Sequence, residues 1–155
     1  MTEYSVQAAD RVKEFLDKKE LRHEWLEDHG VFKFVMGMRS KIKKAEVIIY
    51  IKKDSILVYG IPPLRADGKD LGRVGEYITR ANYSLIHGNF EMDLSDGEVR
   101  FKSSTRFGED MPSMDVVGAT LFLPLHMWEK YGDGFVALLF SDASPEEEIR
   151  KAEAR

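Results

Sequence analysis

The chain has 155 residues, no cysteine and a formal net charge of −4, from 27 acidic and 23 basic residues. This length suits one domain over residues 1–155, and the lack of cysteine excludes disulfides, thiolate metal sites and a catalytic cysteine. The mildly acidic balance argues against a nucleic-acid partner, and no segment is apolar and long enough to span a membrane. With no signal-peptide pattern at the start, we expect a cytoplasmic protein.

The first forty residues predict a helix and a strand. Apolar residues at helical spacing predict a helix over residues 4–19. Residues 21–28 are compatible with a short edge strand, and residues 28–30 with a turn. Alternation then predicts a strand over residues 31–39, with four apolar side chains on one face: Phe32, Phe34, Met36 and Met38.

Two further strands follow a basic loop. We interpret the loop, which carries Arg39, Lys41, Lys43 and Lys44, as a solvated hairpin tip that protects the sheet edge. Residues 46–53 predict the second strand, and their apolar run 47–51 occupies both faces, which indicates a central strand or one covered on both sides. Residues 56–61 predict the third, ended by two prolines.

A second helix is predicted over residues 70–85, where apolar residues recur three or four positions apart. Asp67 or Asp70 can cap its start. Gly88 is expected to end it, with His87 placed near the helix C-terminus.

The next two strands form a hairpin whose turn is predicted at Asp96 and Gly97, a dipeptide typical of two-residue turns. A two-residue turn pairs apolar residues on one face and opposite charges on the other: Leu94 with Val99, Met92 with Phe101, Asp93 with Arg100, and Glu91 with Lys102. We therefore predict this register, since a slip of one residue would reverse the faces.

The C-terminal part predicts helices only. Residues 114–130 form a strongly apolar helix that Pro124 should kink or divide, and the glycines at 132 and 134 predict a break. Residues 135–140 continue as a short buried helix or, less favoured, a strand. A serine cap and a proline at 144 and 145 begin a last helix that extends to about residue 154. Its expected ion pairs are Glu146 with Arg150 and Glu147 with Lys151.

Segregated helices and an antiparallel sheet place the chain in the α+β class, in the order α-β-β-β-α-β-β-α(α) with the helices packed on the sheet. The third predicted helix is apolar on several sides. Phe122, Leu125 and Trp128 are therefore a candidate partner surface, although a purely core role is the favoured alternative.

The sequence contains no pattern typical of catalysis. It lacks the zinc His-Glu-x-x-His motif, a phosphate-binding glycine loop and a nucleophile elbow, so we expect no catalytic, cofactor-binding or metal-binding residue. The alternative is a small-ligand or metal binder, or a hydrolase, that uses the acidic region between His23 and His29. That alternative requires these side chains to converge, whereas a solvated surface is the simpler interpretation.

Three linked stretches resemble the YbjN family of bacterial proteins, which is also labelled a candidate sensory transduction regulator family. They are RANYSL at 80–85, GNFEMD at 88–93 and DGEVRF at 96–101. The resemblance extends to Trp25, to residues 31–32 and to residues 144–147, and so covers most of the chain. The chain departs from the family pattern at Pro124 and at residues 132–134.

This resemblance implies a fold similar to type III secretion chaperones, which bind segments of client proteins, are often dimeric and have no catalytic residues. We therefore expect a non-enzymatic, chaperone-like or regulatory protein-binding module that forms a homodimer and binds an unidentified protein client. The family-motif residues are expected to be structural: Asn82, Gly88, Asn89, Phe90, Asp96 and Gly97. Asn82 and Asn89 are expected to lock the helix-to-strand junction.

Overall fold

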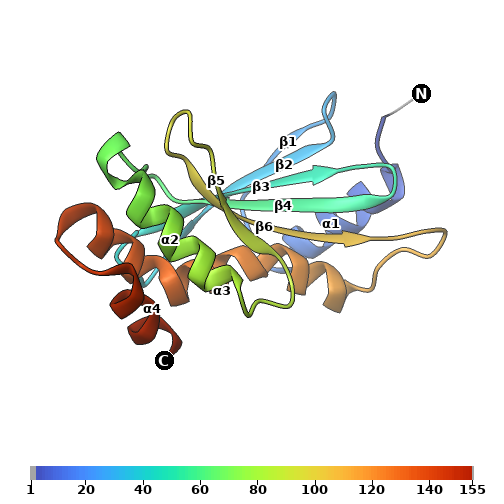
Figure 1. Cartoon of the computed structure of the whole chain (residues 1–155). Helices are drawn as coiled ribbons and strands as arrows, with labels where there is room; N and C mark the ends of the chain where they lie inside the picture. Colours follow the sequence, from blue (N-terminus) through green and yellow to red (C-terminus); the bar gives the residue numbers. More distant parts are fainter. Residues whose placement is uncertain (1–2, 155) are drawn as a thin grey trace.

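The computed structural model describes residues 3–154, which form a sheet with helices on one face (Figure 1). The elements are α1 (Val6–Lys18), β1 (Glu24–Leu26), β2 (Val31–Gly37), β3 (Lys44–Ile51), β4 (Ser55–Ile61), η1 (Gly68–Asp70), α2 (Leu71–Asn82), β5 (Asn89–Met92), β6 (Val99–Arg106), α3 (Met114–Phe140) and α4 (Pro145–Glu153). The sheet has the antiparallel order β1-β2-β3-β4-β6-β5. The α+β class is confirmed, and residues 24–26 form the short edge strand.

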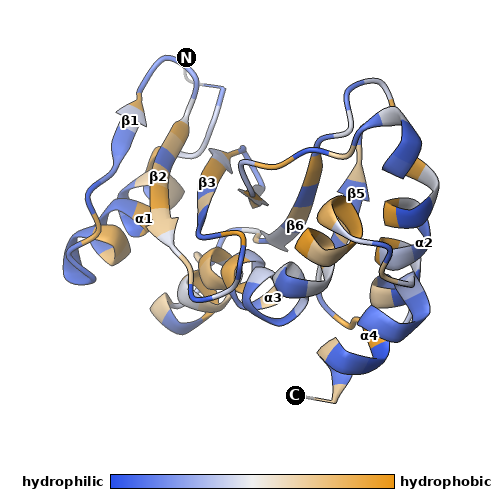
Figure 2. Ribbon diagram, turned by 90° about the vertical axis from the view of Figure 1, so that its left-hand side faces the viewer, coloured by the Kyte–Doolittle hydropathy of each residue, from blue (hydrophilic) through white to orange (hydrophobic). Residues whose placement is uncertain are grey.

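The core lies between the sheet and the helices. Along β3 and β4, buried residues alternate with half-buried or exposed ones, which is the pattern of a sheet covered on one face. Phe34 pairs with Val47, Val47 with Gly60 and Gly60 with Phe101, so these residues form one row on the covered face. In Figure 1, α3 runs beneath the sheet, and Figure 2 shows α1 and α3 below the strands with α2 beside β5.

Helix α3 is continuous over 27 residues, so the predicted break at residues 132–134 is wrong, and Pro124 does not divide the helix. The two glycines allow close packing: a Cβ on Gly132 would lie 2.7 Å from the Ser40 hydroxyl oxygen, and one on Gly134 would collide with the Tyr77 hydroxyl. That hydroxyl donates to the Tyr131 carbonyl (2.7 Å). These contacts with other elements outweigh a helix-propensity cost of about 1 kcal/mol per glycine.

Helix α2 is shorter than predicted, because it ends at Asn82 and not at residue 85. Neither Asp67 nor Asp70 caps a helix through its side chain; Asp70 is buried and lies 3.7 Å from the Arg73 guanidinium. Gly88 lies in the loop after the helix at φ +73, and a Cβ there would meet the Lys102 carbonyl oxygen at 2.5 Å. Gly88 therefore allows the loop to reach β6 and does not end the helix.

The hairpin register differs from the prediction by two residues. Met92 pairs with Val99, and Phe90 pairs with Phe101, so residues 93–98 form a longer loop. Phe90, Met92, Val99 and Phe101 still share one face, because a slip of two residues keeps paired side chains on their own side. The predicted pairing of Leu94 with Val99 is wrong, since Leu94 lies in the loop and is 70% exposed. The loop is fixed by a neighbouring segment: the Ala66 amide donates to the Gly97 carbonyl (2.9 Å). This tertiary contact outweighs the preference of the Asp-Gly pair for a tight turn.

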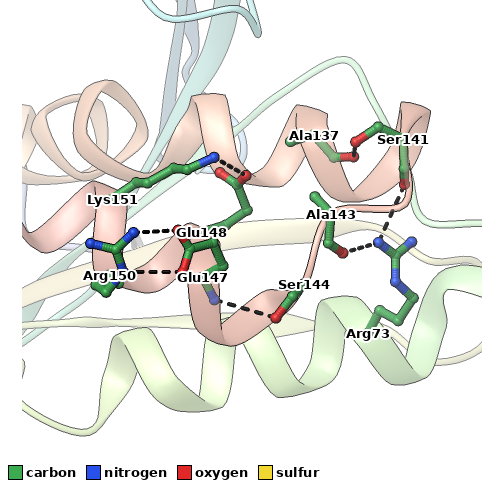
Figure 3. A network of polar contacts seen from close by, with 9 residues as sticks. All are labelled: Arg73, Ala137, Ser141, Ala143, Ser144, Glu147, Glu148, Arg150 and Lys151. Atoms are coloured by element: carbon green, nitrogen blue, oxygen red, sulfur yellow. Dashed lines mark hydrogen bonds and ion pairs between the residues drawn. The ribbon is translucent and has the colours of Figure 1, made fainter.

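The last helix begins as predicted, since the Ser144 hydroxyl accepts a hydrogen bond from the Glu147 amide. Its ion pairs are spaced by three residues and not four: Arg150 with Glu147, and Lys151 with Glu148. Figure 3 shows this helix beside Arg73 of α2. The Arg73 guanidinium donates to three carbonyls at the α3–α4 junction, those of Leu138, Ser141 and Ala143. One cation thus stabilises the C-terminal end of α3 and the turn into α4.

Asn82 joins the end of α2 to the start of β5. Its amide group donates to the Phe90 carbonyl (3.0 Å), and its carbonyl accepts from the Phe90 amide (2.7 Å). Asn89 makes one longer bond, to the same Phe90 carbonyl (3.1 Å). The side chain of Asn82 therefore pairs with Phe90 as a neighbouring strand would.

Replacing Asn82 with alanine should lower the free energy of unfolding by about 1–3 kcal/mol, because the Phe90 backbone amide loses its partner beside the core. Urea denaturation measures this change. Asn89→Ala is the matched control and should cost less than half as much. Equal losses in the two variants would contradict the role assigned to Asn82.

Candidate functional site

The predicted partner surface on α3 is wrong for two of its three residues. Trp128 is 1% exposed and its indole N–H donates to the Gly60 carbonyl (2.9 Å), while Leu125 is 6% exposed. Phe122 is half-buried and packs against Phe15, with ring centroids 5.5 Å apart. These side chains are occupied within the chain, because α3 is surrounded by the sheet, α1 and α2.

Most side chains of the acidic region around His23 and His29 are exposed. His23 bonds to the Leu21 carbonyl (2.8 Å) and lies edge-on to Phe32, whereas His29 is exposed. Across residues 3–154, no group of three histidine, aspartate or glutamate side chains is placed to hold a metal ion. The convergence that a metal-binding function here would require is therefore not seen among the described residues.

The face of the sheet opposite the helices carries apolar side chains that no helix of the described residues covers. We call this surface the open face; its apolar residues are Val35, Ile48, Tyr50, Leu57, Tyr59 and Ile61. Val35 is 61% exposed, and the others are half-buried. Contiguous apolar surface of this kind marks interaction sites on proteins. None of the helices in residues 3–154 is long and apolar enough to cross a membrane.

A hollow of about 490 Å³ lies in the open face, over β3, β4 and the start of β6. Its floor holds Tyr50 and Tyr59, whose rings meet edge to face at 5.8 Å. The Arg100 guanidinium lies 3.8 Å from the centroid of the Tyr59 ring, within cation–π range. The remaining apolar lining residues are Val35, Ile48, Ile61, Pro62 and Pro63. The hollow can therefore accept apolar or aromatic groups of a partner.

Arg100 is held in place by Glu91, whose carboxylate bonds to its guanidinium (2.6 Å) and lies 3.2 Å from the Lys102 ammonium. Partial burial alone would raise the pKa of Glu91. The hydrogen bonds from Arg100 and Lys102 outweigh that effect, so the pKa of Glu91 lies below its ordinary value. The ion pair positions Arg100 over Tyr59 at the margin of the hollow.

The lowered pKa of Glu91 makes part of the stability depend on pH. A depressed folded-state pKa stabilises the protein above the ordinary glutamate value of about 4.3, and this contribution is lost as pH falls through the folded pKa. Glu91→Gln should therefore be less stable than wild type at pH 7, with a smaller further loss below about pH 4. Urea denaturation between pH 3 and 7 measures how the free energy of unfolding of wild type and of Glu91→Gln changes with pH.

The control for this experiment is Glu109→Gln, because Glu109 is exposed and no described residue forms an ion pair with it. The control should follow the wild-type curve. Parallel curves for wild type and Glu91→Gln over the whole range would contradict the assigned ion pair.

The sequence held a signal for the open face that the partner-surface prediction did not use. The run 47–51 is apolar on both faces, and so is most of 56–61. Two interpretations were open for the first run, a central strand or one covered on both sides. The structure shows the central position, with β3 third in a six-strand sheet, and a cover on one face only.

Comparison with solved structures establishes the fold. The chain is similar to the crystal structure of YbjN from E. coli, described as a candidate transcription regulator, with a TM-score of 0.50 and 12% sequence identity. The match covers 96% of this chain and 90% of that chain. No protein-family model matches the sequence, and no curated protein matches it. At this identity the similarity concerns the fold alone.

Proposed function

We propose that this protein is a non-enzymatic protein-binding module, chaperone-like or regulatory, whose open face binds a client protein. The observation that carries the proposal is the hollow with Tyr50 and Tyr59 in its lining, on a sheet face without a helical cover. A regulatory role for the YbjN fold neighbour is consistent with a binding function. The hollow offers aliphatic and aromatic side chains with charged residues of both signs, among them Glu46, Glu98 and Arg100. Such a surface suits a protein partner with apolar anchors and a polar rim.

The test is capture of proteins from a native-host lysate by wild type and by a variant of the open face, with quantitative mass spectrometry. Val35→Lys places a charge on the open face at a 61% exposed position, so folding should be retained. The matched control is Val6→Lys, because Val6 is 51% exposed on α1, away from the sheet face. Circular dichroism and thermal unfolding confirm that both variants fold.

The proposal predicts at least one protein that wild type and Val6→Lys retain equally and that Val35→Lys loses. Ile48→Lys, within the hollow, should reproduce the loss. Equal retention by all variants would contradict binding at the open face, and no retained protein above background would contradict the function itself.

We further propose that the protein forms a homodimer, as the resemblance to dimeric chaperones implies. Light scattering on the purified chain should then give twice the 17.8 kDa chain mass. A single-chain mass that persists at high concentration contradicts the dimer and leaves the client-binding proposal untouched.

A further inference from the structure

The outer edge of β6 is unpaired over its C-terminal half. β5 begins at Asn89, so it pairs with β6 only as far as Lys102. β4 continues to pair with β6 up to Arg106. Residues 103–106 therefore have a strand on one side only among the described residues, and Figure 1 shows this part of β6 at the front of the sheet, above α3.

The geometry identifies which backbone groups are free on this edge. The Phe107 amide donates to the Asp54 carbonyl (2.9 Å), which continues the ladder between β6 and β4. Alternate residues of an antiparallel strand direct their N–H and C=O groups to opposite sides, so Ser103 and Thr105 face β4 in the same way. Ser104 and Arg106 therefore direct theirs away from β4, where an exposed row of such groups is a template for another strand.

A groove of about 290 Å³ lies beside this edge, between β6 and α3. Ser103 and Thr105 line one wall, and Val116, Ala119 and Leu123 of α3 line the other. Val116 is 43% exposed, although it is a large apolar residue. Side chains that an added strand directs toward α3 would enter this apolar groove.

The other side of the same edge is cationic. Lys102, Ser104 and Arg106 alternate with the groove residues, so their side chains lie on the open face. The Arg106 side chain is 87% exposed and its nitrogen lies 4.0 Å from the Asp54 carboxylate, a distance at which solvent screens the pair strongly. Lys102 is paired with Glu91 and lies beside β5, so Arg106 is the cation that an added strand would meet. Acidic outward side chains are favoured beside it.

We propose that residues 103–106 of β6 bind an extended segment of a client protein as an added β-strand, with apolar residues alternating with acidic ones. The proposal rests on the protein-binding function above and names the chemistry of the client. A second copy of this chain fits less well. Asn89 of β5 already occupies the position opposite Lys102, so two β6 edges can pair only about Thr105. That register sets Ser104 of each copy opposite Arg106 of the other and gives the cation no acidic partner.

The probe is an acetylated and amidated octapeptide that alternates valine and glutamate, titrated into the full chain labelled with ¹⁵N. Binding should slow amide hydrogen exchange at Ser104 and Arg106, measured by NMR. A peptide N-methylated at every valine and glutamate, which cannot complete the strand pairing in either direction, should not bind. A peptide that alternates valine and lysine should bind roughly three- to tenfold more weakly.

Two variants test the two sides of the edge. Arg106→Glu should weaken binding of the valine–glutamate peptide roughly three- to tenfold and strengthen binding of the valine–lysine peptide. Its control is Lys53→Glu, at an exposed turn between β3 and β4. Val116→Lys should abolish the protection of Ser104 by entering the groove, whereas Val6→Lys should leave it intact.

Binding without protection at Ser104 and Arg106, or equal affinity for the N-methylated peptide, would overturn the proposal. Protection that appears without peptide and rises with protein concentration would assign the edge to a second copy and also overturn it. Suppose that no peptide binds, but a protein captured from the lysate by wild type is not captured by Val35→Lys. The strand-addition proposal is then wrong and the proposed function stands. If the peptide protects the edge but no captured protein depends on Val35, strand addition stands and binding at the open face fails.

Discussion

Replacing Trp128 with alanine is expected to lower the free energy of unfolding by about 3–5 kcal/mol, the usual cost of removing a buried aromatic side chain. The ring lies among Phe90 and Phe135, with centroids 5.0 and 5.3 Å away, and the indole N–H satisfies the Gly60 carbonyl. Alanine would leave a cavity in the core and a buried carbonyl without a donor. Urea denaturation followed by circular dichroism measures the change.

His126→Ala is the matched control, because His126 lies two residues earlier on the exposed side of the same helix. It should change the free energy of unfolding by no more than about 0.5 kcal/mol. A Trp128→Ala variant of wild-type stability would contradict the core placement and restore Trp128 as a candidate partner residue.

Replacing Gly97 with alanine is expected to cost about 2 kcal/mol or more. Gly97 adopts φ +77, a conformation that strains any residue with a Cβ, and an added Cβ would collide with the Ala66 backbone carbonyl. The β5–β6 loop would have to leave its position on residues 65–66. The backbone strain at Gly97 and the collision with Ala66 therefore both destabilise the variant.

Gly72→Ala is the matched comparison, because the same glycine-to-alanine change should raise the stability there. Gly72 is an exposed residue within α2, and a Cβ there would meet nothing within 4 Å. Alanine should stabilise the helix by about 0.5–1 kcal/mol. Thermal unfolding of the two variants should thus move in opposite directions, and a shift in the same direction would contradict the docking of the loop on Ala66.

Local patterns in the sequence determined the kinds of element and their order. Period-two alternation predicted β2, and a stripe of apolar residues three and four apart predicted α2, because each pattern places apolar groups on one side of a regular backbone. Ser144 and Pro145 predicted the start of α4 correctly, since a cap and a first-turn proline act within a few residues. These effects need no information about distant segments.

The candidate site was less accessible to sequence reasoning. Helix α3 carried the strongest apolar signal, yet Trp128 and Leu125 are core residues, since the sheet and the other three helices pack around α3. The open face carried a weaker signal at Ile48 and Tyr50. An apolar residue on the second face of a strand looks the same in the sequence whether or not a helix covers that face. Only the positions of the helices distinguish the two cases.

The chain by itself thus determined the α+β class, the order of elements and the shared face of Phe90, Met92, Val99 and Phe101. Tertiary structure decided the register of β5 against β6, the continuity of α3 through Gly132 and Gly134, and the absence of a cover on the open face among the described residues. The physical reason is the range of the interactions. Periodicity and capping act between neighbours in sequence, whereas the contacts of Gly97 with Ala66 and of Gly134 with Tyr77 exist only after distant segments have packed.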